Sequence, residues 1–182
     1  MNSTRLWVFG YGSLMWNPGF QVADHQIARL TGYYRCFCMR SIHHRGTPEA
    51  PGLVLALDAR PGSFCDGVAL AVPAGDEAAV LAMLRERELI SSAYLEQVLP
   101  VTLADDTTVQ AVSFVVDADH VQYCGGLALE EQAQIIAAAT GGRGTNRDYL
   151  YNTAGHLTDL GIADADLGWL ADRVRVLAGG QS

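Results

Sequence analysis

Residues 6–14 of the 182-residue chain have the sequence LWVFGYGSL, a short apolar run that leads directly into two glycines separated by a tyrosine. The run from Leu6 to Tyr11 has the length and composition of a buried β-strand. The two glycines, at positions 10 and 12, allow the following backbone to turn tightly and to point successive N–H groups at an anion or a polarised carbonyl. This stretch therefore predicts a core strand that ends in a candidate binding loop.

Two common glycine motifs do not fit this loop. A dinucleotide-binding GxGxxG would need glycine or alanine at position 15, where the chain has Met15, and Pro18-Gly19 would end a following helix early. A nucleophile elbow, GxSxG, would need a serine at position 12 or a glycine at position 15. The sequence therefore disfavours a dinucleotide site, and it also disfavours a serine hydrolase built on Ser13 and His44.

The composition excludes several function classes. All twelve Lys+Arg cations are arginine, because the chain has no lysine. Schiff-base enzymes, pyridoxal-phosphate enzymes and P-loop NTPases each need a lysine amine. Arginines and acids cancel over residues 1–90, so the net charge of −8 arises in residues 91–182. A nucleic-acid partner needs a basic stripe, which this chain lacks, whereas a small acidic substrate suits the N-terminal half.

No run of residues approaches the ~20 consecutive apolar residues that span a bilayer, and residues 1–5 do not resemble a secretory signal. We therefore expect a cytoplasmic protein with no membrane partner. The four cysteines show neither a CxxC motif nor paired Cys/His spacing, so we expect reduced core thiols and no metal. Self-repulsion of the acidic second half slightly favours a monomer, although the sequence does not establish the oligomeric state.

The predicted elements change from strands to helices along the chain. Strands are expected over residues 6–11, 33–42, 53–58, 68–72, 97–103 and 109–116. Helices are expected over 77–87, with Asp76 as a cap and Ala79, Val80, Met83 and Leu84 on one face, and over 129–140, 147–160 and 167–177. Strands first and helices later predict one α+β domain over residues 1–182, a small, mostly antiparallel β-barrel with flanking helices.

Two further stretches carry residue types suited to a small acidic substrate. Arg35, on an expected strand, and Arg45, in the loop at 41–52, offer planar guanidinium groups that match a carboxylate. The segment LRERELI at 84–90 passes from charged to apolar residues, so either Glu86 or Glu88 could lie at the core boundary. Burial there would raise the proton affinity of the carboxylate, as a general base requires. The alternative interpretation of both stretches is a solvated surface.

Together these stretches resemble the ChaC family. The matching motifs are WVFGYGSLMW at 7–16, HRGTPEAPG at 44–52, Arg87-Glu88 followed by Tyr94, and NRDYL at 146–150. The family consists of γ-glutamylcyclotransferases that act on glutathione. The resemblance implies a compact γ-glutamylcyclotransferase-like fold around a small barrel, with no metal and no organic cofactor. It also implies that glutathione is the small-molecule substrate and is cleaved to 5-oxoproline and Cys-Gly.

The resemblance also assigns residues. Tyr11, Gly12, Ser13 and Leu14 become the loop that binds the γ-glutamyl group, and Phe9 and Gly10 join it as substrate-binding residues. Glu88 becomes the catalytic acid/base, and it is preferred to Glu86 because its spacing to Tyr94 fits better. From their residue types rather than from the resemblance, we expect Arg35, or less favourably Arg45, to hold a substrate carboxylate, and Tyr149 is a weaker candidate for a hydroxyl contact.

Two alternative functions stay open. The same chemistry could act on another γ-glutamyl amino acid or amine, which would lack the glycine carboxylate of glutathione. A non-catalytic module of the same fold could instead bind an acidic metabolite. A carboxylate at position 88 argues against that module, because an anion binder gains nothing from a negative charge there.

Overall fold

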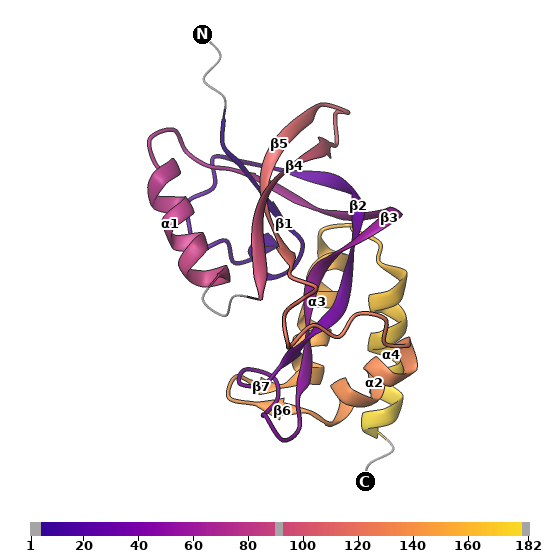
Figure 1. Cartoon of the computed structure of the whole chain (residues 1–182). Coiled ribbons are helices and arrows are strands. Elements are labelled where there is room, and N and C mark those ends of the chain that lie inside the picture. The colour runs from indigo at the N-terminus through magenta and orange to yellow at the C-terminus, as the bar shows by residue number, and fades with distance from the viewer. Residues whose placement is uncertain (1–4, 90–92, 180–182) are drawn as a thin grey trace. The chain divides into compact units, whose positions relative to one another are not determined.

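The computed structural model describes residues 5–89 and 93–179 (Figure 1). The chain divides into two compact units, which are described separately. Unit 1 comprises Met1–Cys36 and Ala56–His120, and unit 2 comprises Phe37–Leu55 and Val121–Ser182. Neither unit is a continuous stretch of chain. A single domain over residues 1–182 stays a prediction.

Five strands form a closed barrel in the order β1-β3-β2-β4-β5. They are β1 (Trp7–Gly10), β2 (Asp24–Ser41), β3 (Gly52–Ala71), β4 (Tyr94–Leu103) and β5 (Thr108–Val116). β1 runs antiparallel to β3 and parallel to β5, and β4 runs antiparallel to both β2 and β5. The predicted small, mostly antiparallel barrel with flanking helices is confirmed.

The buried side chains explain why β1 lies at the centre of unit 1. All four residues of β1 are buried, and Val8 and Phe9 are completely enclosed. A continuous apolar run of this kind suits a strand that is covered on both faces. On β5 the last six residues, 111–116, are also buried. The core strand predicted from residues 6–11 is therefore confirmed, with bounds one residue shorter at each end.

The helix α1 (Glu77–Glu88) lies beside the barrel strands of unit 1 (Figure 1). Val80 and Leu84 are buried, as the predicted apolar face requires, but Ala79 is exposed. The predicted cap was wrong in its chemistry, because the Asp76 side chain makes no capping hydrogen bond. The Glu77 carboxylate instead accepts a hydrogen bond from the backbone N–H of Gly75 at 2.8 Å.

Four strands are longer than predicted, β4 and β5 by three residues and one residue, and β2 and β3 by much more. β2 begins at Asp24 rather than residue 33, and β3 joins the two runs expected at 53–58 and 68–72. Residues 59–62 of β3 are exposed and carry no apolar pattern, which is why the sequence predicts two strands where the structure has one. Residues 24–36 of β2 and 56–71 of β3 belong to unit 1, and the rest of both strands belongs to unit 2.

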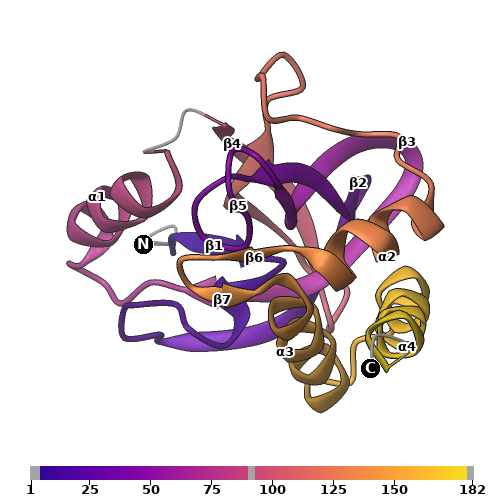
Figure 2. The ribbon, with the colours of Figure 1, turned by 90° about the horizontal axis from the view of Figure 1, so that it is seen from below.

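Unit 2 contains the remaining helices, α2 (Leu129–Ala138), α3 (Asn146–Asp159) and α4 (Ala165–Gly179), and the short strands β6 (Thr140–Gly141) and β7 (Gly144–Thr145). The three helices pack against one another (Figure 2). α3 begins one residue before the predicted range 147–160, and the Thr145 hydroxyl caps it by accepting a hydrogen bond from the Asp148 N–H at 3.2 Å. Gly161 follows the helix with φ +74°, the left-handed conformation of a glycine just past a helix end.

None of the described helices is both long enough and apolar enough to cross a membrane. The four cysteines are free thiols, and Cys36, Cys38 and Cys65 are buried. These three therefore act as small core residues, as the sequence predicts.

Candidate functional site

The candidate site in unit 1 begins where β1 ends. Tyr11, Gly12, Ser13 and Leu14, here called the YGSL loop, follow β1 and lead into the one-turn 3₁₀ helix η1 (Ser13–Met15). The hydrogen bonds inside this turn begin with the N–H of Met15, which donates to the Gly12 carbonyl at 2.9 Å. The first N–H groups of a helix have no acceptor within it, so those of Ser13 and Leu14 have none in η1.

The two glycines around Tyr11 have different surroundings. A Cβ atom on Gly10 would come within 3.1 Å of Leu14 Cβ and 3.2 Å of the Met15 nitrogen. A Cβ atom on Gly12 would meet no heavy atom of the described chain within 4 Å. Close packing between the strand and its turn explains the glycine at position 10. No such clash explains the glycine at position 12, whose backbone angles are φ −138° and ψ −128°.

Arg35 holds the YGSL loop against β3. Its side chain is buried, its Nε donates to the Tyr11 carbonyl at 2.6 Å, and its Nη2 donates to the Asp66 carbonyl at 2.6 Å. Charge-assisted bonds of this length are strong, so they restrain the backbone at Tyr11. The sequence predicts that this guanidinium holds a substrate carboxylate. In the structure it binds two carbonyl groups of the protein, and its role toward a substrate stays a prediction.

Glu88 and Glu86 differ in their exposure to solvent. Glu88 is the last residue of α1, and its side chain is 18% exposed. Burial raises the pKa of the Glu88 carboxyl, and the adjacent Arg87 guanidinium partly opposes that rise. Glu86 is exposed. Of the two carboxylates left open by the sequence, Glu88 has the environment of a general base.

Arg87 connects the end of α1 to the YGSL loop. Its Nη2 donates to Ser13 Oγ at 2.8 Å, and its Nη1 donates to the Asn17 carbonyl at 2.8 Å. Its Nε lies 3.6 Å from Glu88 Oε1. Sequence patterns alone assign Arg87 no role. Its only signal was its place in the Arg87-Glu88 motif, since its other partners are 70 and 74 residues away in the chain.

Arg45 and Tyr149 come together in unit 2. Arg45 Nη1 donates to the Thr145 carbonyl at 3.2 Å, and its guanidinium carbon lies 5.6 Å from the centre of the Tyr149 ring. The Tyr149 hydroxyl accepts a hydrogen bond from the Leu55 N–H at 3.2 Å. Both side chains therefore support the backbone around them, and their substrate contacts stay predictions.

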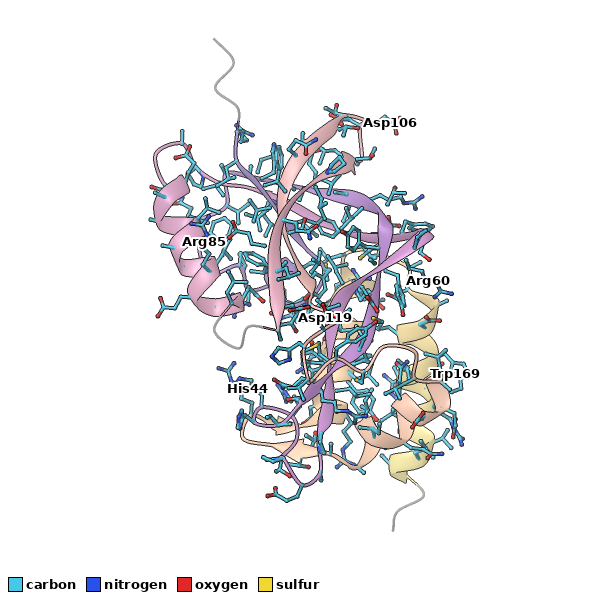
Figure 3. All side chains as sticks on the ribbon, in the orientation of Figure 1. His44, Arg60, Arg85, Asp106, Asp119 and Trp169 are labelled. Atoms are coloured by element: carbon cyan, nitrogen blue, oxygen red, sulfur yellow. The ribbon has the colours of Figure 1, made fainter. Side chains whose placement is uncertain are left out.

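The loop that carries Arg45 also contains His44, which is labelled in Figure 3. The pKa of His44 is lowered, chiefly by burial and then by the positive charges of Arg143, His43 and Arg45. A neutral imidazole is therefore favoured near neutral pH. In unit 1, Ser13 Oγ accepts a hydrogen bond from the Arg87 guanidinium, so this hydroxyl contacts a cation.

These features can be compared with known proteins. The family model described as ChaC-like protein matches residues 6–177 of this chain. The chain belongs to the ChaC family. Membership of this family explains why the YGSL loop, the Arg87-Glu88 pair and the later NRDYL segment occur together in one chain.

Curated ChaC relatives cover nearly the whole chain. A glutathione-specific gamma-glutamylcyclotransferase of Escherichia coli (strain K12) is 38% identical over 172 residues, which is 94% of this chain and 74% of that protein. Gamma-glutamylcyclotransferase 2-1 of Arabidopsis thaliana is 37% identical over 177 residues, which is 93% of this chain and 82% of that protein.

A solved structure supports the fold. The crystal structure of a gamma-glutamylcyclotransferase specific to glutathione from yeast has a TM-score of 0.83, at 22% sequence identity. The match covers 95% of this chain and 96% of the yeast chain. The predicted γ-glutamylcyclotransferase-like fold is therefore confirmed.

Proposed function

We propose that this ChaC protein is a γ-glutamylcyclotransferase that cleaves glutathione to 5-oxoproline and Cys-Gly. Relatives at 37–38% identity bear the name of that enzyme class, and the one from Escherichia coli is named for glutathione. The observation that carries the proposal is the buried carboxyl of Glu88, with its raised pKa, joined by Arg87 to a glycine loop.

The proposed reaction is intramolecular. The α-amino group of the substrate attacks its own γ-carbonyl carbon, a five-membered lactam closes, and the amide bond to Cys-Gly breaks. Both reacting groups belong to one substrate molecule, so the step is unimolecular without the protein, and the pocket has only to hold the γ-glutamyl chain in the conformation that brings the amine to the carbonyl carbon. The protein then needs to move protons from the attacking nitrogen to the leaving nitrogen and to stabilise one developing negative charge.

Glu88 is the proposed proton carrier. Its carboxylate takes a proton from the α-ammonium group, which frees the amine to attack. Glu88 passes this proton to the departing Cys-Gly nitrogen, and after the attack it carries a second proton from the ring nitrogen to the same nitrogen. The lactam is then neutral, Cys-Gly leaves as an ammonium, and the carboxylate is regenerated at the end of the cycle. A carboxyl whose pKa is raised by burial is a better base near neutral pH than an exposed one, and this supports Glu88 over Glu86.

The YGSL loop is the proposed binding site for the γ-glutamyl group. The N–H groups of Ser13 and Leu14 have no acceptor within η1, so they are suited to stabilise the oxyanion that forms on the γ-carbonyl oxygen. The open space beside Gly12 would admit the substrate close to the backbone. Phe9 and Gly10 place this loop through β1.

The proposed roles of the three remaining residues differ. Arg35 acts on the substrate through the loop whose Tyr11 carbonyl it holds, in addition to its predicted carboxylate contact. Arg45 and Tyr149 stay candidates for a substrate carboxylate and a hydroxyl contact. Substitution of Arg45 by Gln should raise the KM for glutathione more than the KM for a γ-glutamyl amine, because the amine has one carboxylate fewer.

Incubation of the protein with glutathione, followed by chromatography for 5-oxoproline and Cys-Gly, tests this function. We expect equal amounts of both products, and a panel of γ-glutamyl amino acids and amines should be turned over more slowly. A folded protein that forms neither product would refute the proposal. Binding of γ-glutamyl compounds without turnover would instead favour the non-catalytic module.

A matched pair of variants tests the base. General acid–base catalysis typically contributes about 10²–10⁴-fold, so Glu88→Gln should lower kcat by at least that much. Glu86→Gln removes an exposed carboxylate from the same helix turn and should leave kcat close to wild type. A large loss with Glu86→Gln and none with Glu88→Gln would reverse the assignment.

A further inference from the structure

We propose that Arg87 is a positioning residue that holds Glu88, at the end of α1, against the YGSL loop. The proposal rests on the function proposed above and adds a residue to it. Each nitrogen of the guanidinium has its own partner: Nη2 contacts Ser13, Nη1 contacts Asn17, and Nε faces Glu88. One rigid group therefore contacts both the YGSL loop, through Ser13, and the proposed proton carrier, Glu88.

The shape of the guanidinium is essential to this arrangement. Its planar fork presents donors in fixed directions, so it contacts the Ser13 hydroxyl at the start of η1 and the Asn17 carbonyl just beyond the end of η1. A lysine ammonium would keep the charge but would act as a single point on a flexible stem. Geometry and charge at position 87 can therefore be separated by substitution.

Stability alone explains little of this arrangement. The Arg87 side chain is 28% exposed, and its hydrogen bonds lie at the surface. Exposed ion pairs typically contribute about 0–1 kcal/mol to folding. Arg85, two residues earlier and labelled in Figure 3, makes a comparable fork in which Nε and Nη2 both donate to Glu96, at 2.7 and 3.0 Å. Arg85 is therefore a matched control for Arg87.

The charge of Arg87 has a separate consequence. Among the described residues, Arg87 is the charged group that acts on the Glu88 carboxyl, and it opposes the effect of burial on the pKa. Removing the charge should raise the pKa of Glu88 further. Because the reaction needs the carboxylate form to accept a proton, the acidic limb of the pH–activity profile should move to higher pH.

The test compares Arg87→Gln, Arg87→Lys and Arg85→Gln in the full chain. A displacement of about 1 Å in an active site can cost about 10²-fold, so both Arg87 variants should lose 10- to 100-fold in kcat. The acidic limb should move to higher pH in Arg87→Gln and stay near its wild-type position in Arg87→Lys. Arg85→Gln should keep the wild-type rate and pH profile, and all three variants should melt close to the wild type.

Equal rates and pH profiles for Arg87→Gln and Arg85→Gln, in a protein whose wild type converts glutathione, would overturn the inference. Wild type without turnover would refute the proposed function, and NMR then tests the inference separately. Arg87→Gln should raise the pKa of the Glu88 carboxyl, measured by NMR titration, and should shift the amide signals of Gly12 and Ser13. Arg85→Gln should do neither. An unchanged titration and unchanged amide signals would contradict the role of Arg87.

Discussion

At Gly12 the effect of a substitution on ligand binding can be tested separately from its effect on packing. Gly10 and Gly67 are both explained by the fold, since a Cβ atom on Gly67 would collide with the Gly10 carbonyl and the Phe9 ring. A methyl group on Gly12 would enter space that no described atom fills. A substitution there should therefore affect the ligand while leaving the fold intact.

We expect Gly12→Ala to lower kcat/KM for glutathione by at least about tenfold, because the added methyl occupies the space proposed for the substrate. The free energy of unfolding is measured on the same variant, so that weaker substrate binding is distinguished from a loss of folded protein. Steady-state kinetics and chemical denaturation measure both quantities. Gly155→Ala, on α3 and also without a neighbour for its Cβ, is the control. Wild-type kinetics in Gly12→Ala would contradict the assigned binding loop.

Glu88 should reduce stability near neutral pH. Its pKa in the folded state is raised by burial, so the folded protein must ionise an unfavourably placed carboxyl as the pH rises. Below the unfolded pKa the Glu88 carboxyl is protonated in both states, and the stability of the folded protein is fully present. That stability is lost as the pH rises through the folded pKa. Glu88→Gln should consequently gain stability relative to wild type near neutral pH.

Urea denaturation of both proteins at neutral pH and at about pH 4, near the ordinary carboxyl pKa, measures this effect. The advantage of Glu88→Gln should be larger at neutral pH than at about pH 4. An advantage that is independent of pH, or one that grows as the pH falls, would contradict the raised pKa.

At the scale of elements, the start of α3 anchors the start of β3. Asn146 is completely buried, its Oδ1 accepts from the Leu53 N–H at 2.7 Å, and its Nδ2 donates to the Leu53 carbonyl at 2.8 Å. Both bonds lie within unit 2 and join residues 93 apart in the chain. One side chain thus satisfies both the backbone donor and the backbone acceptor of one buried residue, Leu53.

Asn146→Ala should lower the free energy of unfolding by about 2–4 kcal/mol, because each unpaired buried group costs about 1–3 kcal/mol. Asn152→Ala removes an exposed amide from the same helix and should change stability by less than about 0.5 kcal/mol. Thermal and urea denaturation measure the difference. Equal stability of the two variants would show that the Asn146 bonds contribute nothing net.

Elements with local signals were predictable from sequence. The ends of α3 follow from Thr145, Asp148 and Gly161, all within a turn of the helix, and β1 follows from one apolar run. The first part of β2 carried a weaker signal, the alternation of buried Ala28 and Leu30 with exposed neighbours. β3 was divided in the prediction because its exposed middle, around Pro61-Gly62, has the composition of a turn.

The candidate site was predictable only in part. The YGSL loop and the Glu86/Glu88 pair lie within recognisable local motifs. The contacts of Arg87 with Ser13 and Asn17, and of Arg35 with Tyr11 and Asp66, join distant segments that no local pattern relates. Such contacts depend on how the barrel closes, so they required the structure.

At the scale of the molecule, the chain should unfold as one cooperative system. Each unit consists of two separate segments, and β2 and β3 contribute residues to both units. Local unfolding of one unit would therefore disturb strands that the other unit needs. Calorimetry, together with circular dichroism and tryptophan fluorescence, should show coincident single transitions. Two resolved transitions would contradict the single domain predicted from the sequence.

The proposed chemistry is tested most directly by turnover of glutathione in water enriched in ¹⁸O, with the products analysed by mass spectrometry. If the α-amine of the substrate attacks its own γ-carbonyl, no water enters the product. The account predicts unlabelled 5-oxoproline and an equal amount of Cys-Gly. Release of glutamate carrying ¹⁸O in its γ-carboxyl group would show hydrolysis by water and would contradict the account, as would the absence of both products from the folded protein.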